Sequence, residues 1–142
     1  MFLLDVNVVI ALIDPAHIHH NIAHRWFGTE ANENFATCPL VQNGVVRIVG
    51  HPAYPNAQAS PAIVAEILNK LLQHPGHVFW PDDVSLLDPA RFDSTALLSH
   101  KQVTDAYLLG LAVAHAGKLA TLDTKISASA VREGRSAVCI IH

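Results

Sequence analysis

The chain has 142 residues, a length that suits a single domain with a hydrophobic core of ordinary size. Hydrophobic residues make up 51% of it and charged residues 15%, a composition that excludes a disordered chain. The net charge of −3 excludes a surface that is basic throughout, so any contact with nucleic acid must come from a local patch.

The chain opens with an apolar run that ends at a carboxylate. Residues 2–4 read FLL and predict a buried strand, which Asp5 follows directly. A buried charge costs free energy unless it is paired, hydrogen-bonded or bound to a metal, so Asp5 has a structural partner or a chemical role. We see neither a signal peptide nor an apolar stretch of the about 20 residues that span a membrane, and we expect a soluble cytoplasmic protein.

Helix and strand signals then alternate along the chain. The apolar periodicity, together with caps and first-turn prolines, predicts helices at residues 7–13, 19–29, 39–49, 61–73 and 105–116. Short apolar runs predict strands at residues 2–4, 35–38, 78–80, 118–122 and 137–141. We expect Thr104 to cap the last helix and Gly117 to end it, and we expect residues 81–99 to form mostly loop.

This alternation predicts the fold class. Strands that are apolar throughout and are separated by helices are typical of a parallel sheet that is covered on both faces. We therefore expect one α/β domain over residues 1–142, a three-layer α/β/α sandwich around a mostly parallel sheet of four to five strands. Cys38 and Cys139 lack metal-ligand spacing and are expected to be free thiols in a reducing compartment.

Three acidic residues are placed to meet at one edge of that sheet. Asp5 follows the first strand, Asp123 follows the fourth, and Asp105 lies in the first turn of the last helix. Asp105 alone can be a favourable first-turn acid and Asp123 alone a loop or capping residue, whereas Asp5 follows a buried strand and is harder to explain in this way. Sites in parallel sheets form at the carboxyl ends of strands. Three converging carboxylates without basic partners suit Mg²⁺ or Mn²⁺, which can activate water against a phosphodiester.

The stretches LLDVNVVIAL, TCPLVQNGVVRIV and VTDAYLLGLAVAHAGKLATLD, in this order, resemble the PIN-domain ribonucleases, in particular the VapC-type toxins of bacterial toxin–antitoxin pairs. The resemblance covers nearly the whole chain. It implies a metal-dependent endoribonuclease with an RNA substrate, a small antitoxin protein as partner and a homodimeric state. It also implies that Asp5, Asp105 and Asp123 are the catalytic metal ligands.

The resemblance extends to residues around these acids and departs at one position. Asn7 and Thr121 match polar residues that orient the carboxylates by hydrogen bonds. Many PIN proteins have a glutamate in the helix after the second strand, and Gln42 takes that place here. Glutamine offers a carbonyl oxygen but no charge, so we expect Gln42 to be a neutral ligand or to hold a water, with weaker metal binding than a four-acid site.

Other residues and functions stay open at this stage. Arg47 either binds a phosphate of RNA or pairs with a buried acid, and His100 is a second candidate for RNA contact. With Gln42 in place of an acid, the chain can also be a module that binds RNA or an antitoxin with little or no turnover. An aspartate-nucleophile phosphatase is disfavoured because Asn7 stands where such enzymes need an acid, and a receiver-like domain is disfavoured because the pair Asp82-Asp83 is misplaced.

Overall fold

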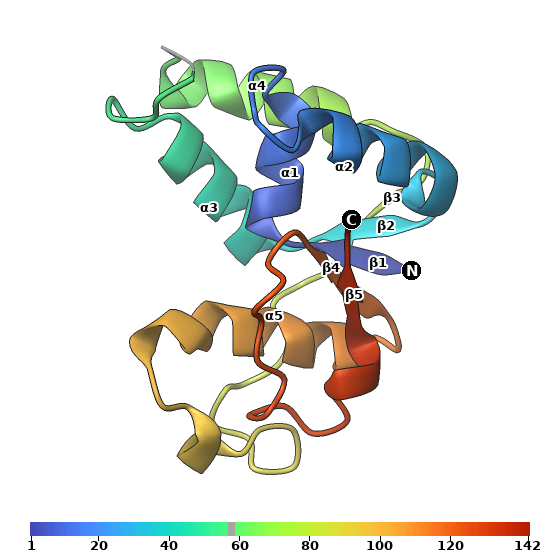
Figure 1. Ribbon diagram of the computed structural model, residues 1–142, viewed down its shortest axis with the longest axis vertical. Helices are drawn as coiled ribbons and strands as arrows, with labels where there is room; N and C mark the ends of the chain where they lie inside the picture. Colours follow the sequence, from blue (N-terminus) through green and yellow to red (C-terminus); the bar gives the residue numbers. More distant parts are fainter. Residues whose placement is uncertain (57–58) are drawn as a thin grey trace.

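The structure, a computed structural model, describes residues 1–56 and 59–142, and within them five short strands form one sheet (Figure 1). Every neighbouring pair of strands runs parallel. In their order across the sheet they are β3 (His77–Phe79), β2 (Phe35–Thr37), β1 (Phe2–Leu4), β4 (Lys118–Thr121) and β5 (Val138–Ile140). The predicted parallel sheet is confirmed.

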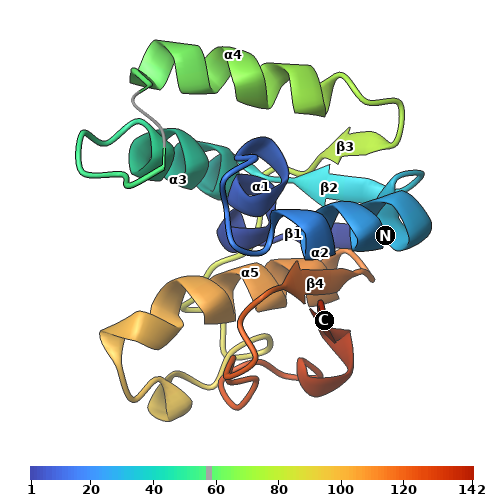
Figure 2. The same ribbon diagram turned by 45° about the horizontal axis from the view of Figure 1, so that its top comes forward.

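The described chain also contains five α-helices. They are α1 (Val6–Ile13), α2 (His20–Trp26), α3 (Pro39–Val49), α4 (Pro61–Leu72) and α5 (Val103–Ala114). In Figures 1 and 2, α1, α3 and α4 lie on one side of the sheet and α5 lies on the other, while α2 packs on α1. In the described residues, none of these helices has both the length and the apolarity that a membrane crossing requires.

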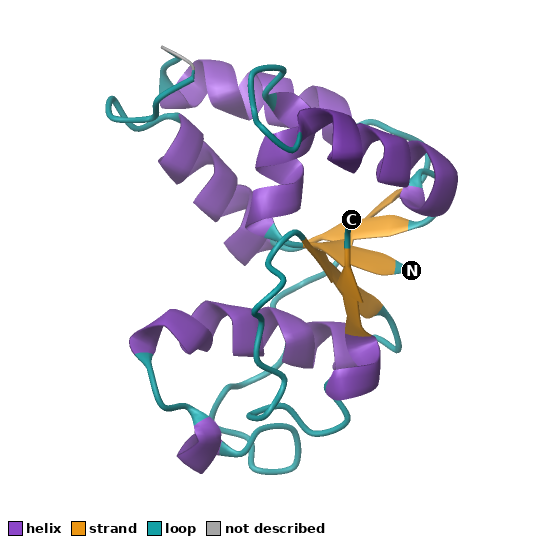
Figure 3. Ribbon diagram, viewed as in Figure 1, coloured by secondary structure: helices purple, strands orange, loops and turns teal. Residues whose placement is uncertain are grey.

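The path of the chain reverses direction at the central strand β1. From β1 the chain moves outward through β2 to β3, and it then crosses to the other side of β1 to form β4 and β5. The helices of the first half therefore cover one face, and α5 covers the other (Figure 3). This reversal creates a crevice between the carboxyl ends of β1 and β4, which is where parallel sheets bind their ligands.

The start of α5 differs from the prediction. Thr104 is not the cap, because a 3₁₀ turn, His100–Gln102, leads directly into the helix. Ser99 Oγ accepts from the N–H of Lys101 at 3.3 Å, and the side-chain oxygen of Gln102 accepts from the N–H of Ser99 at 3.0 Å. This reciprocal capping box satisfies the backbone of the turn, and Asp105 remains in the first turn of α5 as predicted.

The end of α5 also differs. Ala116, and not Gly117, adopts the left-handed conformation that stops the helix, with φ at 55°. Gly117 is required for another reason, since a Cβ there would lie 2.8 Å from the carbonyl oxygen of Met1 and 2.9 Å from the ring of Trp80. The glycine therefore permits close approach of the chain at the entry to β4.

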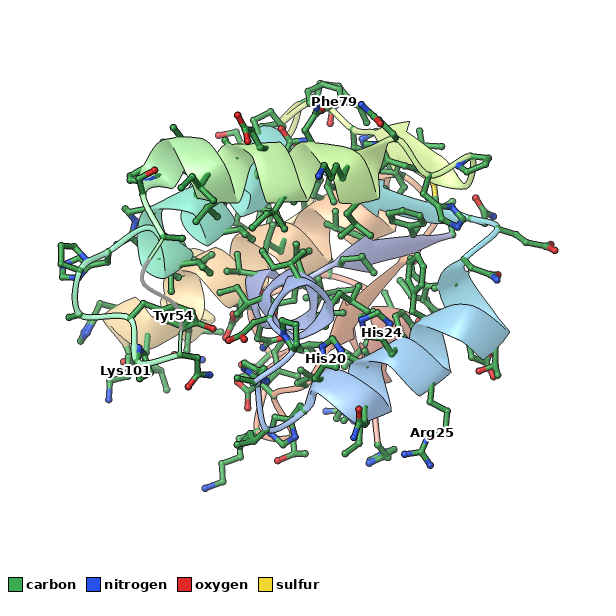
Figure 4. All side chains as sticks on the ribbon, turned by 90° about the horizontal axis from the view of Figure 1, so that it is seen from above. His20, His24, Arg25, Tyr54, Phe79 and Lys101 are labelled. Atoms are coloured by element: carbon green, nitrogen blue, oxygen red, sulfur yellow. The ribbon has the colours of Figure 1, made fainter. Side chains whose placement is uncertain are left out.

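Two histidines of α2 fasten the end of α1 (Figure 4). Nδ1 of His20 lies 2.7 Å from the carbonyl oxygen of Ala11, and Nε2 of His24 lies 2.9 Å from that of Leu12. A carbonyl oxygen can only accept, so each of these ring nitrogens donates a proton. The two side chains supply donors to carbonyls that the final turn of a helix leaves without partners. Beyond α2 the chain continues as a π-helical turn, Phe27–Ala31, which ends two residues later than the predicted helix.

The packing of α5 gives a test of the fold. A Cβ at Gly110 would lie 2.1 Å from the buried ring of Phe92, which crosses the helix from the preceding loop. Gly110→Ala is expected to lower the free energy of unfolding by about 1–2 kcal/mol, because overpacking outweighs the gain in helix propensity. Urea denaturation measures this change. Gly28→Ala is the matched control, since a Cβ there meets nothing within 4 Å, and equal stability of the two variants would contradict the packing.

Candidate active site

The carboxylate of Asp5 is nearly buried, with 5% of the residue exposed, at the junction of β1 and α1. Asp5 is the N-cap of α1, and its Oδ1 accepts from the N–H of Val6 at 2.7 Å. Its own N–H donates to the carbonyl of Ala120, which extends the pairing of β1 with β4 by one residue. Helix and sheet together therefore fix the position of this carboxylate.

The second oxygen of Asp5 is held by side chains from both strand ends. The hydroxyl of Thr121 donates to Oδ2 at 2.7 Å, and the amide of Asn7 donates to it at 3.2 Å. Asn7 in turn accepts from the N–H of Leu122 at 3.1 Å, and Thr121 Oγ1 accepts from the N–H of Asp123. The structure thus places Asn7 and Thr121 where the sequence suggested, in contact with Asp5.

Burial and neighbouring acids raise the pKa of two of the three carboxyls, those of Asp5 and Asp105. The pKa of the Asp5 carboxyl is raised, mainly because it is buried and in part through repulsion from Asp123. Burial, followed by repulsion from Asp5 and then from Asp123, raises the pKa of Asp105 to about 6. In the described part of the chain, no lysine or arginine forms an ion pair with any of the three. None of the three carboxylates is therefore neutralised by a direct ion pair with a described residue.

A cleft of about 430 Å³ opens over two of these acids. Its walls come from the start of α1, one face of α3 and the start of α5. The residues that line it are Asp5, Val6, Asn7, Ile10, Leu40, Asn43, Gly44, Arg47, Ile48, Thr104 and Asp105. Asp123 is not part of this lining, and its Oδ1 accepts from the N–H of Lys125 at 2.8 Å. We refer to this hollow as the acidic cleft.

The structure does not bring Gln42 to the acidic cleft. Its side-chain nitrogen donates to Thr37 Oγ1 at 3.0 Å, and the residue lines another hollow, between α3 and α4, to which Asn43 also contributes. The amide that lines the cleft is Asn43, which the sequence analysis did not single out. Helical geometry could have identified it, because residues four apart share a face, and Asn43 is four before Arg47 whereas Gln42 is five before.

The two candidate RNA contacts are placed differently. Arg47 is exposed, lines the acidic cleft and forms no ion pair within the described residues, so the alternative of a buried acidic partner is not supported. His100 is exposed in the turn before α5 and is not among the lining residues of the cleft.

The pair Asp82-Asp83 has structural partners away from Asp5. Asp82 accepts from the N–H of Leu40 at 3.0 Å and from the hydroxyl of Tyr107 at 2.9 Å. Asp83 lies 3.0 Å from the ring of His115, and the pKa of its carboxyl is lowered by this contact. These contacts fasten the loop after β3 to α3 and α5, which gives the pair a role in the fold.

The chemistry of the acidic cleft suits a hard cation. Carboxylate and amide oxygens are the ligands that Mg²⁺ and Mn²⁺ prefer, and a cation would relieve the repulsion that raises the pKa of Asp5 and Asp105. In residues 1–56 and 59–142, no three His, Cys, Asp or Glu side chains gather closely enough to hold an ion by themselves. A cation here would therefore keep several waters, as Mg²⁺ does.

Comparison with known proteins agrees with this geometry. A model of the PIN domain matches residues 2–131. The chain belongs to the PIN-domain family.

Three relatives from Mycobacterium tuberculosis align with nearly the whole chain. Ribonuclease VapC44 is 43% identical over 129 residues, which cover 91% of this chain and 90% of the relative. Ribonuclease VapC39 is 41% identical over 128 residues, which cover 90% of this chain and 92% of the relative. Ribonuclease VapC29 is 38% identical over 125 residues, which cover 88% of this chain and 87% of the relative. The chain is a homologue of the VapC ribonucleases.

The raised pKa of Asp105 predicts a pH-dependent stability. Between an unfolded value of about 3.9 and the folded value of about 6, the folded chain keeps a proton that the unfolded chain has lost. The free energy of unfolding therefore falls as the pH rises through this range. Asp105→Asn should raise the free energy of unfolding by about 1–2 kcal/mol at pH 7.5. This is less than the free energy that corresponds to the full pKa shift, because the side chain is partly exposed to solvent. The gain should vanish near pH 4, where the carboxyl group of the folded chain is protonated and therefore uncharged.

Urea unfolding in EDTA between pH 4 and pH 8 measures this effect. Glu66→Gln, an exposed change on α4, is the control and should alter stability by less than about 0.5 kcal/mol at every pH. A gain in stability for Asp105→Asn that is the same at pH 4 and pH 8 would contradict the raised pKa of Asp105.

The positions of Gln42 and Asn43 predict different effects of an added carboxylate on Mg²⁺ binding. Asn43→Asp should tighten Mg²⁺ binding by about tenfold because it adds a charge to the acidic cleft, whereas Gln42→Glu should change it by less than about twofold. Calorimetric titration of the two variants with Mg²⁺ measures the difference. Tighter binding by Gln42→Glu alone would restore the role that the sequence suggested for Gln42.

Proposed function

We propose that this PIN domain, over residues 1–142, is a metal-dependent endoribonuclease and the toxin of a VapBC-type pair. The observation that carries the proposal is the acidic cleft, which Asp5 and Asp105 line at the point where the strand order reverses, with Asp123 just after the adjoining strand β4. The similarity to proteins named as VapC ribonucleases supports RNA as the substrate.

Each acid has a role in this proposal. Asp5 and Asp105 both line the acidic cleft and would hold Mg²⁺ or Mn²⁺, and Asp123 would complete the set of acids or order a water. When bound, the cation would neutralise charge on the phosphodiester and make water a better nucleophile. Thr121 and Asn7 keep the Asp5 carboxylate in one orientation, which the hydrogen bonds at 2.7 and 3.2 Å support.

The proposed partners follow from the same relationship. A VapC toxin acts with a small VapB antitoxin, which we propose blocks the acidic cleft, and we propose a homodimer that acts in the cytoplasm. Exposed apolar residues offer surface for such contacts, including Ile63 and Ile67 on α4 and Phe79 on β3, the last of which is labelled in Figure 4.

A second function is favoured by one observation. The amide Asn43 lines the acidic cleft where an acid would add a third carboxylate to those of Asp5 and Asp105, and a cleft with fewer carboxylates binds a cation less tightly. A module that binds RNA or an antitoxin with little turnover is therefore the alternative. Measured cleavage of RNA separates the two functions.

Substitution of Asp5 tests the proposed catalysis. Asp5→Asn should reduce RNA cleavage by at least about a hundredfold, because it removes the best-fixed charge of the site, and EDTA should silence the unmodified protein. Cleavage of total RNA in Mg²⁺ and in Mn²⁺, followed on a gel, measures the loss. Glu66→Gln should cleave like the unmodified chain, and thermal melts should show that Asp5→Asn is folded. Undiminished cleavage by Asp5→Asn or in EDTA would overturn the mechanism.

A further inference from the structure

A second hollow adjoins the acidic cleft along the last turns of α3. It has a volume of about 290 Å³ and is lined by Arg47, Ile48, His51, Ala53, Tyr54 and Pro55. Arg47 and Ile48 line both hollows, so the two hollows adjoin at the last turns of α3. We refer to this second hollow as the Tyr54 groove.

The aromatic wall of the Tyr54 groove is fixed before any ligand arrives. The hydroxyl of Tyr54 donates to Oδ2 of Asp14, a carboxylate that is only 6% exposed, and the amide of Asn56 donates to the same oxygen at 3.0 Å. The N–H of Tyr54 donates to the carbonyl of His51, which closes the turn. Because the hydroxyl of Tyr54 is hydrogen-bonded to Asp14, the aromatic ring is the part of this half-buried side chain that can contact a ligand.

Polar groups of the groove suit an anionic ligand. Nδ1 of His51 accepts from the N–H of Ala53 at 2.9 Å, so the proton of a neutral ring lies on Nε2, where it can be donated. Arg47 is exposed at the junction of the two hollows and has no ion-pair partner in the described residues. Its position in the last turn also suits the helix dipole, but that explanation does not account for its place between the hollows.

We propose that the Tyr54 groove binds the nucleotide next to the scissile phosphodiester of single-stranded RNA, an inference that rests on the proposed ribonuclease function. The guanidinium of Arg47 contacts a phosphate, and the unpaired base stacks on the ring of Tyr54 above Ile48 and Pro55. Single-stranded RNA is recognised in this way, by cationic contacts to the backbone and by bases stacked on aromatic rings. A base in a duplex is already stacked on its neighbours, so the groove selects unpaired segments.

Two substitutions of Tyr54 separate the contribution of its aromatic ring to RNA binding from that of its hydroxyl group. Tyr54→Phe and Tyr54→Leu both lose the hydrogen bond to Asp14, so they should lose similar stability, but Tyr54→Phe alone keeps an aromatic face. Each is made in the Asp5→Asn background, so that RNA is bound without being cleaved. Binding of fluorescent oligoribonucleotides of about eight nucleotides should weaken by about tenfold for Tyr54→Leu and by less than about twofold for Tyr54→Phe.

A single abasic nucleotide, moved along the same oligonucleotide, locates the stacked base. One abasic position should weaken binding by about tenfold with Tyr54 present and have little effect with Tyr54→Leu, because the base and the ring act as one pair. Equal binding by the Tyr54→Leu and Tyr54→Phe proteins, or abasic effects that do not depend on Tyr54, would overturn the inference.

The salt dependence of binding tests Arg47. Arg47→Gln should weaken binding of all sequences and reduce the slope of log affinity against log salt by about 0.7, whereas Arg47→Lys should keep the slope. Lys70→Gln, which removes an exposed charge on α4, is the control and should leave the slope unchanged. Equal slopes for the Arg47→Gln and Lys70→Gln proteins would overturn the phosphate contact.

Failure of the inference is distinct from failure of the proposed function. If the unmodified protein cleaves RNA while the Tyr54 and Arg47 variants bind like their controls, the Tyr54 groove is not a nucleotide site and the ribonuclease function stands. If binding depends on Tyr54 and Arg47 but no metal-dependent cleavage is detected, the groove binds RNA as inferred and the proposed catalysis is wrong.

Discussion

The hydrogen bond from the Thr121 hydroxyl to the buried carboxylate of Asp5 is the contact on which this site depends. It joins the carboxyl ends of β1 and β4, two strands that meet only because the chain reverses direction at β1. The same carboxylate caps α1 through the N–H of Val6. In the described residues, no buried side-chain nitrogen or oxygen lacks a hydrogen-bond partner. The fold therefore tolerates this burial by surrounding the charge with donors, and not with a cation of its own.

Helix α1 links the fixed carboxylate of Asp5 in the acidic cleft to the Tyr54 groove. Its eight residues begin after Asp5, in the acidic cleft, and end before Asp14, which holds Tyr54. Val8 to Leu12 are all buried, and His20 and His24 satisfy carbonyls in the last turn, so both ends of the helix are fixed. A short, rigid helix with a carboxylate at each end thus sets the spacing between the acidic cleft and the Tyr54 groove.

The sequence allowed much of the fold to be predicted, and with it the places of the acids after β1, after β4 and in the first turn of α5, because these depend on local pattern, but Asp123 does not line the acidic cleft. Apolar runs that stop at Asp5 and just before Asp123 identify strand ends, and parallel strands bring their ends together. The face of α3 that lines the acidic cleft was harder to predict than the strand ends. Gln42 and Asn43 are adjacent in sequence but about 100° apart around α3, so a single position decides which of them lines the acidic cleft. Tyr54 was missed because its partner Asp14 lies 40 residues away, a contact that no local pattern encodes.

The two halves of the molecule meet at the acidic cleft, and the charges there oppose their contact. Asp5 belongs to β1 and α1, whereas Asp105 belongs to α5 on the other side of the sheet (Figure 2). Repulsion between them contributes to the raised pKa of Asp105, so the fold loses some stability where its halves join. A cation bound between these carboxylates would turn repulsion into attraction and link the halves through the site itself. Stability and metal binding are therefore coupled here, because the charges that weaken the metal-free fold are those that bind the cation.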